Sequence, residues 1–353
     1  MKMLFVNSYQ GAGIGDFGFS LHSHLKSISG NQYEYIETGQ SWRAFFRVWR
    51  VALFFQGHVI MNIGFTSFGR SMARNFLSFV LIRLSQFSKN NMTIILHDSI
   101  EMIGKNSSGY KVNRFIEMGG SLAITLIRNV KIVVFSNRLY ENLGDKYVCR
   151  KVKHFHFPCR NLGSNTSTNT IKRKAVITIG YIAPYKGLDI LPEIKRNMPD
   201  IDFFVVGGFH KVLSEVESGK HYFDKLRNSL LESGIKMTGY IGLQELERLL
   251  SEFSFVGVLP YVSSSGSSYS AIFLVERGIP LIATPLPEMV ELETLGAGIR
   301  VVEREPKAIT DALSDLCTNV DYYREMQKQQ ESYCARNTFD NFAKSFVDFI
   351  TSN

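Results

Sequence analysis

The sequence predicts an α/β protein built from two doubly wound, Rossmann-like domains that face each other across a cleft. First, its 353 residues exceed the size at which one hydrophobic core usually stops growing. Second, short apolar runs typical of buried parallel strands alternate with helical segments in both halves of the chain. Third, a polar tract without periodicity, Asn161–Thr170, divides the two halves as a linker would.

Each half of the chain contains its own series of strands and helices. In the first half we expect strands at Lys2–Asn7, Tyr33–Glu37, His58–Ile63, Thr93–Leu96 and Lys131–Phe135, and helices at Phe17–Ile28, Trp42–Phe55 and Arg70–Phe87. In the second half we expect strands at Ala175–Ile179, Asp202–Val206, Ser254–Leu259 and Pro280–Ala283, and helices at Leu188–Arg196, His221–Ser233, Glu245–Glu252 and Ser268–Arg277. Ligands of such sheets bind beyond the carboxyl ends of the strands, so we expect the functional site there.

Composition and charge restrict the class of protein. The 45% hydrophobic and 20% charged residues are ordinary for a globular chain, and four cysteines without CxxC spacing favour free thiols in a reducing compartment. No apolar stretch suits a secretory signal or reaches the roughly 18 residues of a spanning helix. We therefore expect a cytoplasmic protein. The net charge of +8 suits nucleic acid, an anionic membrane or a phosphorylated substrate, but no nucleic-acid-binding module is recognised.

A glycine-rich segment, residues 11–16, follows the first predicted strand and precedes a helix. Glycine lets the backbone approach an anion closely, and a helix N-terminus offers unpaired N–H donors. The segment departs from the GxGxxG dinucleotide fingerprint by one position, because Phe17 or Gly18 would have to serve as the third glycine. Its position favours contact with a phosphate or a sugar over a plain tight turn.

Two loops of the second half carry further candidates. Lys186, in the segment Gly180–Asp189, can neutralise a diphosphate leaving group, although a solvated surface lysine is the alternative. The segment Pro260–Tyr269 is rich in serine, and its N–H and hydroxyl groups can donate to phosphate oxygens. Because it lies directly between a strand and a helix, an anion-binding loop is favoured over a flexible linker. Glu276, near the end of the next helix, can accept hydrogen bonds from ribose hydroxyls.

Together these segments resemble glycosyltransferase family 4 (glycosyl transferases group 1) and its GT-B relatives. Four family motifs have counterparts in this chain: GRLxPxKGLD resembles Gly180–Asp189, xFTGYV resembles Met237–Ile241, GxPVIA resembles Gly278–Ala283, and GGxxE falls near Glu288 or Glu291. Two family helices also have counterparts, the helix after xFTGYV at Glu245–Leu250 and the C-terminal crossing helix at Arg336–Ile350. The likeness is strong over about residues 175–293 and diffuse in the first half. Several ordered motifs in one chain are more specific than any one of them.

The resemblance implies a division of the chain and a set of roles. Residues 1–165 would bind the acceptor, residues 166–335 the nucleotide sugar, and residues 336–353 would form a helix that crosses back to the first domain. The catalytic residues would be His97, beside the reacting sugar, and Lys186, at the donor diphosphate. The remaining donor-binding residues would be Gly13 and Gly15 from the first domain, Tyr181, then Gly239, Tyr240 and Ile241 near the base, Gly266, Ser267 and Ser268, and Glu276 at the ribose.

Two positions depart from the family pattern. The first glutamate of its E-x7-E pair falls at Ser268, and the arginine of its GR pair is Tyr181. The missing arginine removes a permanent positive charge from the diphosphate site. The missing glutamate removes a carboxylate expected near the hydroxyls of the donor sugar. The resemblance therefore defines the family better than it defines the identity of the donor or the retention of anomeric configuration.

Two pairs of histidines, His22 with His24 and His154 with His156, have the spacing of metal ligands. Neither pair has a carboxylate or cysteine cluster beside it in the sequence, so a structural role is favoured. The resemblance likewise implies no bound metal and no cofactor beyond the nucleotide sugar. No close carboxylate pair indicates a glycosidase.

The predicted helix Trp42–Phe55 combines aromatic and basic residues. Trp42, Phe45, Phe46 and Trp49 are expected on one face, and Arg43, Arg47 and Arg50 on another. Such a helix can lie on anionic lipid, but it can equally pack its aromatic face on the sheet. Basic residues in Arg70–Arg74 slightly favour contact with the inner face of a membrane.

From the sequence we expect the chain to be a GT-B glycosyltransferase. It would move a sugar from a nucleotide-diphosphate sugar to a saccharide or lipid-linked acceptor, with retention of anomeric configuration. The alternative is a non-catalytic GT-B scaffold or partner subunit that binds nucleotide sugar without turnover. An epimerase is disfavoured because an acidic catalytic cluster is missing, and a pyridoxal-type phosphorylase because the chain is short. No nucleic acid partner is expected.

Overall fold

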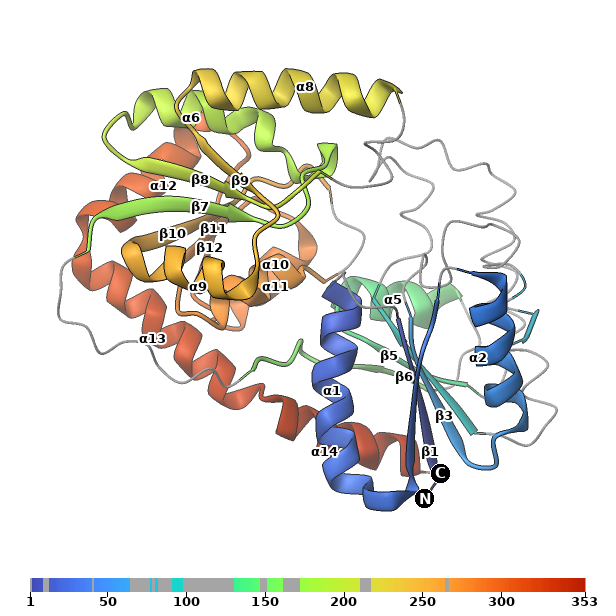
Figure 1. The fold of residues 1–353 in the computed structure, drawn as a ribbon. Helices are drawn as coiled ribbons and strands as arrows, with labels where there is room; N and C mark the ends of the chain where they lie inside the picture. The colour runs from blue at the N-terminus through green and yellow to red at the C-terminus, as the bar shows by residue number, and fades with distance from the viewer. Residues whose placement is uncertain are drawn as a thin grey trace.

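Two parallel α/β sheets form the framework of the protein in this computed structural model (Figure 1). The structure describes residues 2–8, 13–39, 41–63, 91–97, 130–146, 151–160, 172–209, 217–263 and 267–352, together with residues 77, 80 and 81. The predicted helix Arg70–Phe87, apart from those three residues, and the predicted linker Asn161–Thr170 lie outside these ranges.

The first sheet has the strand order β2-β1-β3-β4-β5-β6, with every neighbouring pair parallel. The bounds are Met3–Asn7 for β1, Tyr33–Glu37 for β2, His58–Ile63 for β3, Asn91–Leu96 for β4, Val130–Val134 for β5 and Val152–His154 for β6. The chain reverses direction across the sheet between β1 and β3, which is the switch point where α/β sheets bind ligands.

Side chains alternate between the two faces of this sheet, as the period of a strand requires. Met3 and Phe5 pack with α1 (Gly13–Ser29) and α14 (Phe339–Thr351). Leu4 and Val6 pack on the other face with α2 (Trp42–Phe54) and α5 (Asn137–Lys146). Both faces are therefore covered, as in doubly wound folds.

The second sheet has the order β12-β11-β10-β7-β8-β9 and is also parallel. Its strands are β7 (Lys174–Ile179), β8 (Asp202–Val206), β9 (Lys236–Gly239), β10 (Ser254–Leu259), β11 (Leu281–Ala283) and β12 (Ile299–Val301). This is the Rossmann order, with its switch point between β7 and β10. The loops that carry Lys186 and the predicted serine-rich segment follow these two strands.

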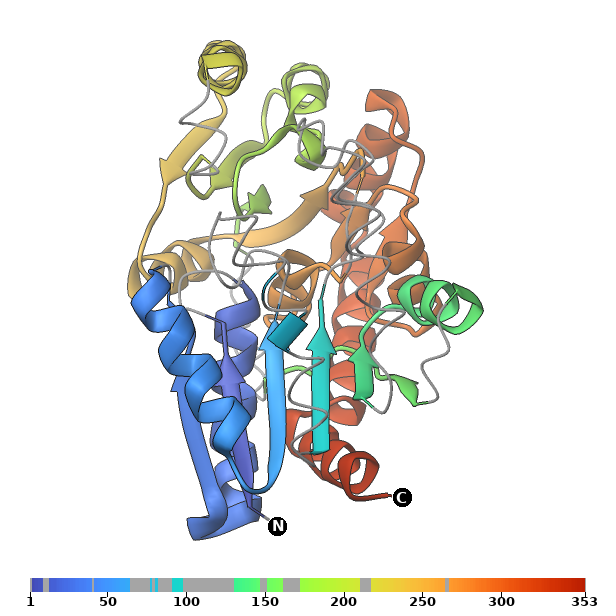
Figure 2. The same ribbon diagram turned by 90° about the vertical axis from the view of Figure 1, so that its right-hand side faces the viewer.

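Helices cover both faces of the second sheet. One face packs against α9 (Leu243–Glu252), α10 (Tyr269–Val275) and α11 (Pro287–Thr294). The other packs against α6 (Leu191–Asn197), α8 (Glu217–Glu232), α12 (Pro306–Thr318) and α13 (Val320–Arg336). The carboxyl ends of the strands of the first sheet point toward this second domain (Figure 2).

The end of the chain returns to the first domain. The helix α13 stops at Arg336, and α14 begins after the cap residue Thr338 and packs against α1 (Figure 1). The predicted single helix Arg336–Ile350 thus begins three residues later than expected, because the side chain of Thr338 accepts a hydrogen bond from the N–H of Asn341. Phe339 and Phe342 contact Phe17 of α1, which fixes the crossing.

Three cysteines, Cys159, Cys317 and Cys334, are free thiols, as the sequence predicts, whereas Cys149 lies outside the described residues. Within the described ranges, no helix combines the length and apolar character needed to cross a membrane.

Candidate active site

Three polar residues sit at the carboxyl ends of β1, β3 and β4. Asn7 and Asn62 are fully buried, and their strands pair so that the two residues lie side by side. The Asn62 amide donates to Asn7 Oδ1 at 2.7 Å and to the carbonyl of Ile14 at 2.9 Å. Its oxygen lies 2.7 Å from Nε2 of His97, directly after β4. His97 was predicted from the sequence, whereas the two asparagines were not, because they resemble ordinary strand residues.

This network sets the protonation of His97. Because the Asn62 amide nitrogen already has two acceptors, its oxygen faces the ring and Nε2 of His97 must carry the proton. Burial lowers the pKa of His97 to about 3. The imidazole is therefore neutral near pH 7, with Nδ1 as its acceptor. Rings of Phe17 and Phe135 pack against it.

The N-terminus of α1 lies beside this network. The helix begins at Gly13, so Gly13 and Gly15 lie in its first turn rather than in a loop before it. A Cβ on Gly18 would come within 1.8 Å of Asn7 Oδ1, and only glycine permits this approach. The spacing of Gly13, Gly15 and Gly18 is that of GxGxxG, so the predicted departure from this fingerprint is wrong.

Lys186 lies at the switch point of the second sheet. Its Nζ donates to the hydroxyl of Tyr261 at 2.5 Å and lies 3.4 Å from Oγ of Ser270. It is also 4.1 Å from the centroid of the Tyr261 ring. Within the part of the chain that the structure describes, no carboxylate pairs with this ammonium group. A partly buried cation held by neutral groups is suited to binding an anion.

Gly180 brings the loop after β7 against this cluster. Its φ is +118°, and a Cβ there would lie 2.7 Å from Ser270 Oγ and 3.7 Å from Lys186 Nζ. Burial raises the pKa of the next residue, Tyr181, and the charges of nearby Tyr240 and of Asp16 on α1 raise it further. The loop thus faces the N-terminus of α1 from the other domain.

The predicted base-binding residues Gly239, Tyr240 and Ile241 follow β9. Gly239 has a φ of +67°, and its carbonyl accepts a hydrogen bond from the N–H of Gly207. The side chain of Tyr240 is 85% exposed and is close enough to Tyr181 to affect its pKa. The three residues border the same loop as Tyr181.

The predicted serine-rich segment makes structural bonds where it is described. Ser267 donates to the carbonyl of Phe135 in the first domain at 3.0 Å. Ser268 caps α10 by accepting from the N–H of Ala271 and also contacts the hydroxyl of Tyr261. Gly266 lies outside the described residues. Both serine hydroxyls are thus engaged within the protein.

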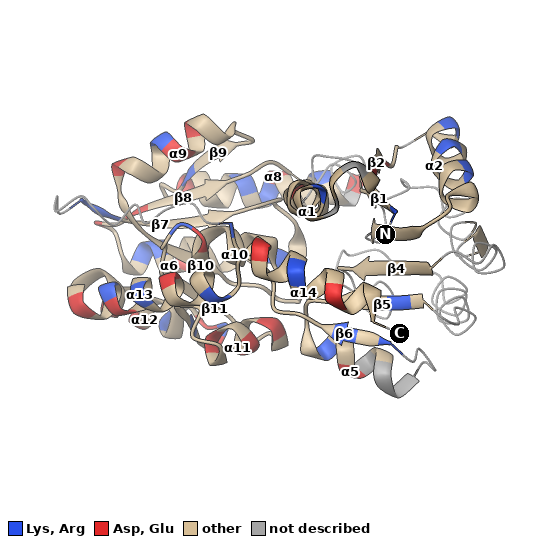
Figure 3. Cartoon of the chain, turned by 90° about the horizontal axis from the view of Figure 1, so that it is seen from below, with Lys and Arg blue, Asp and Glu red and all other residues tan. Residues whose placement is uncertain are grey.

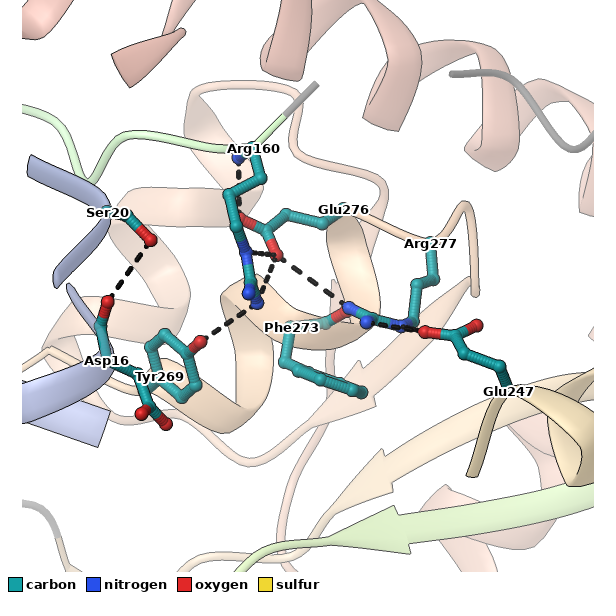
Figure 4. A network of polar contacts seen from close by, with 8 residues as sticks. All are labelled: Asp16, Ser20, Arg160, Glu247, Tyr269, Phe273, Glu276 and Arg277. Carbon is teal, nitrogen blue, oxygen red and sulfur yellow. Dashed lines mark hydrogen bonds and ion pairs between the residues drawn. The ribbon is translucent and has the colours of Figure 1, made fainter. Parts of the chain in front are cut away.

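Glu276 has a different environment from the one the sequence analysis expected. Its Oε1 accepts from the backbone N–H of Arg160 at 2.6 Å, and its Oε2 accepts from the guanidinium at 3.1 and 3.2 Å (Figure 4). Arg277 lies 3.7 Å away. The side chain of Glu276 is only 1% exposed, so a ribose would have to displace Arg160 to reach it. Burial raises its pKa, and Arg160 opposes this effect.

Arg160 is a residue that the sequence analysis missed. It also donates to the hydroxyl of Tyr269 at 2.9 Å, and its charge lowers the pKa of Asp16, which burial raises (Figure 4). It directly precedes the polar tract Asn161–Thr170, and a single arginine beside a predicted linker does not indicate a binding site.

The expectation that no carboxylate accompanies the histidine pairs is wrong. Glu291 of α11 lies beside His154 and His156, with 3.0 Å between His154 Nε2 and Glu291 Oε1. Glu291 belongs to the second domain and lies more than 130 residues after the two histidines of the first domain, so sequence spacing could not connect it with them.

Comparisons with known proteins agree with this geometry. Residues 173–319 match the family Glycosyl transferases group 1. HepE from Anabaena, in complex with UDP and glucose, has a TM-score of 0.74 at 10% identity over all of both chains. Sucrose-phosphate synthase from Thermosynechococcus elongatus has a TM-score of 0.71 at 11% identity, covering 98% of this chain and 97% of that one. A glycosyltransferase from Rickettsia africae has a TM-score of 0.66 at 14% identity, covering 99% and 97%. Among proteins of curated function, none matches the sequence.

Two facing doubly wound domains with this family match define a glycosyltransferase of the GT-B fold. The match to the glycosyl transferases group 1 lies in the second domain, over residues 173–319. The predicted fold class and the predicted type of enzyme are therefore confirmed.

Proposed function

We propose that the protein transfers a glycosyl unit from a nucleoside-diphosphate sugar to a saccharide or lipid-linked acceptor, with retention of configuration and without a catalytic metal ion. The observation that carries this proposal is the environment of Lys186, at the switch point of the second sheet. Among the described residues, its ammonium group has only neutral hydrogen-bond partners. HepE, which has a similar fold, binds UDP and glucose. A uridine nucleotide is therefore our first choice of donor.

In this proposal the domains have separate tasks. Residues 166–335 bind the donor, residues 1–165 bind the acceptor, and residues 336–353 tie the two together. Lys186 stabilises the negative charge that develops on the leaving diphosphate. The N–H groups of the first turn of α1, which includes Gly13 and Gly15, face the donor from the first domain.

His97 orients the donor sugar. Its Nε2 is held by Asn62, so its Nδ1 accepts a hydrogen bond from a sugar hydroxyl. A neutral imidazole with a fixed tautomer adds no charge next to an oxocarbenium-like transition state. Tyr181, Gly239, Tyr240 and Ile241 border the nucleotide, and Glu276 reaches a ribose only after Arg160 has moved.

Donor binding tests the proposal without knowledge of the acceptor. The purified protein is titrated with UDP-, GDP- and ADP-sugars and the free nucleotides in a thermal-shift assay, since a ligand of the native state raises the melting temperature. We expect one nucleotide to raise it and to lose this effect in Lys186→Ala. No shift with any of them at millimolar concentration would refute the proposal. Binding without sugar release to water or to any acceptor would favour the non-catalytic scaffold.

A second proposal is that α2 contacts an anionic membrane surface at the inner face of a membrane. The four aromatic residues of α2 share one face, as predicted, and ring contacts link them, but only part of this face is buried. Phe45 and Trp49 are buried on the sheet, whereas Trp42 is 44% and Phe46 is 56% exposed, with their rings stacked at 5.7 Å. The exposed Arg43, Arg47 and Arg50 stand on the same helix, which has no acidic residue (Figure 3). Exposed aromatic rings beside arginines suit a lipid headgroup region.

A further inference from the structure

A second polar cluster lies at the domain interface and is not used in the proposed transfer reaction. It consists of His154 at the end of β6, His156 two residues later, and Glu291 on α11. One ligand atom of each residue lies within 4.8 Å of the others. The two histidines belong to the first domain and the glutamate to the second.

The distances in this cluster suit a shared cation. Nε2 of His154 lies 3.0 Å from Oε1 of Glu291. Two ligand atoms that each bind Zn²⁺ at about 2.1 Å with tetrahedral angles lie about 3.4 Å apart. Two imidazoles and one carboxylate also form a donor set that Zn²⁺ accepts, with a water as the fourth ligand. Small side-chain movements would bring His156 to the same centre.

The surroundings orient the carboxylate as a metal ligand. Oε2 of Glu291 accepts a hydrogen bond from the backbone N–H of Asn137, the first residue of α5, at 3.1 Å. This bond leaves Oε1 facing the imidazoles, and metal-binding carboxylates are usually held by such a second bond. The buried Nε2 of His154 has no well-aligned hydrogen bond within the described residues, although Oε1 is near.

A small cavity gives the cluster room for an occupant. His156, Glu288 and Glu291 line it, together with apolar residues of both domains that include Phe135 and Leu292. Glu288 stands one helical turn before Glu291 on α11, so a second carboxylate borders the same space. A cation and its bound water would thus contact polar side chains on one side of the cavity and apolar side chains on the other.

We propose that His154, His156 and Glu291 bind one Zn²⁺ ion, which ties the last strand of the first sheet to α11 of the second domain. The ion has a structural task, since none of its three ligands contacts Lys186 or His97 within the described residues. Binding by groups of both domains stabilises only the docked arrangement, so the metal raises the stability of the whole protein.

Zinc titration of the full-length, chelator-treated protein tests this proposal. Calorimetry is expected to show one Zn²⁺ bound per chain, and the melting temperature is expected to rise with added Zn²⁺. The substitutions His156→Ala and Glu291→Gln should each weaken Zn²⁺ binding at least about 10-fold. The matched control is the double variant His22→Ala/His24→Ala, which removes the other His-x-His pair and should bind Zn²⁺ like the wild type.

A spectroscopic measurement on the wild type makes the test independent of whether the variants fold. X-ray absorption of the zinc-loaded protein should show nitrogen and oxygen ligands with the scattering of two imidazoles. Absence of imidazole scattering, absence of Zn²⁺ binding, or equal loss of binding in the His22/His24 control would each overturn the proposal. Donor binding is measured separately with UDP, so the outcome does not depend on the proposed function.

Discussion

Arg160 donates to both carboxylate oxygens of Glu276, from its backbone N–H and from its guanidinium group. The carboxylate is almost completely buried, whereas the arginine side chain is 30% exposed. One residue between the two domains thus supplies most of the neutralisation of a buried charge on α10. Arg277, 3.7 Å away, supplies the rest.

Removal of this arginine should destabilise the protein in a pH-dependent way. Arg160→Ala leaves a buried carboxylate with only Arg277 nearby, and we expect a loss of about 3 kcal/mol in the free energy of unfolding near pH 7.5. The pKa of Glu276 is already raised and rises further without Arg160. A raised carboxyl pKa favours the folded state at low pH and loses this effect as the pH rises through the folded-state pKa, so the deficit should shrink toward pH 5.

Urea unfolding of the single and double variants at pH 7.5 and pH 5 measures this effect. The double variant Arg160→Ala/Glu276→Gln should be more stable than Arg160→Ala at pH 7.5, since glutamine needs no counter-charge. An equal deficit at both pH values would mean that the arginine acts through packing rather than through charge.

The next prediction concerns the leaving group. Lys186→Ala should lower kcat about 100-fold or more, because a positive charge aimed at the diphosphate is lost in the transition state. Lys186→Arg should retain more activity than alanine. Lys307→Ala is the control, since Lys307 lies exposed on α12 and pairs with Asp311. Turnover is measured as nucleotide release from the donor found in the thermal-shift assay, and normal turnover in Lys186→Ala would remove this residue from the mechanism.

The pH dependence of stability should contain a contribution from His97. The folded-state pKa, about 3, is below the usual value, so the stabilising effect of a neutral His97 is complete above about pH 6.5 and is lost as the pH falls toward the folded-state value. Between pH 7 and pH 5 this residue alone should account for about 2 kcal/mol. Urea unfolding of the wild type and of His97→Gln at both pH values should show a smaller loss in the variant, and equal losses would contradict the buried neutral state.

The fold was largely predictable from the sequence because parallel strands leave apolar runs and glycine-rich loops that are local signals. The strands β6 and β12 were missed, since three residues are too few to show a period. Helices α5, α12 and α13 were also missed, as they lie outside the motifs that guided the prediction. The helix α11 was missed although Glu288 and Glu291, near the expected GGxxE motif, lie on it.

The site was less predictable, because it depends on which strand ends become neighbours. Asn7 and Asn62 meet only because β1 and β3 pair, and neither residue differs in sequence from an ordinary strand end. Glu276 was assigned from the family resemblance, as the second glutamate of the E-x7-E pair, while its environment is set by Arg160, 116 residues earlier in the chain. Strand order and domain docking, which create these contacts, have no local signature in the sequence.

The last prediction concerns the exposed face of α2. Vesicles with anionic lipid should carry the wild type upward in a flotation assay at low salt, and neutral vesicles should not, because arginines gain about 1 kcal/mol each near an anionic surface. The triple variant Arg43→Ala/Arg47→Ala/Arg50→Ala and the variant Trp42→Ala/Phe46→Ala should both float less. The matched control is Lys220→Ala/Lys225→Ala/Arg227→Ala, which removes three exposed basic residues from α8. Equal loss of flotation in the α8 control would show that net charge, and not the face of α2, attracts the protein to lipid. No flotation of the wild type would refute the membrane contact and favour a soluble saccharide as the acceptor.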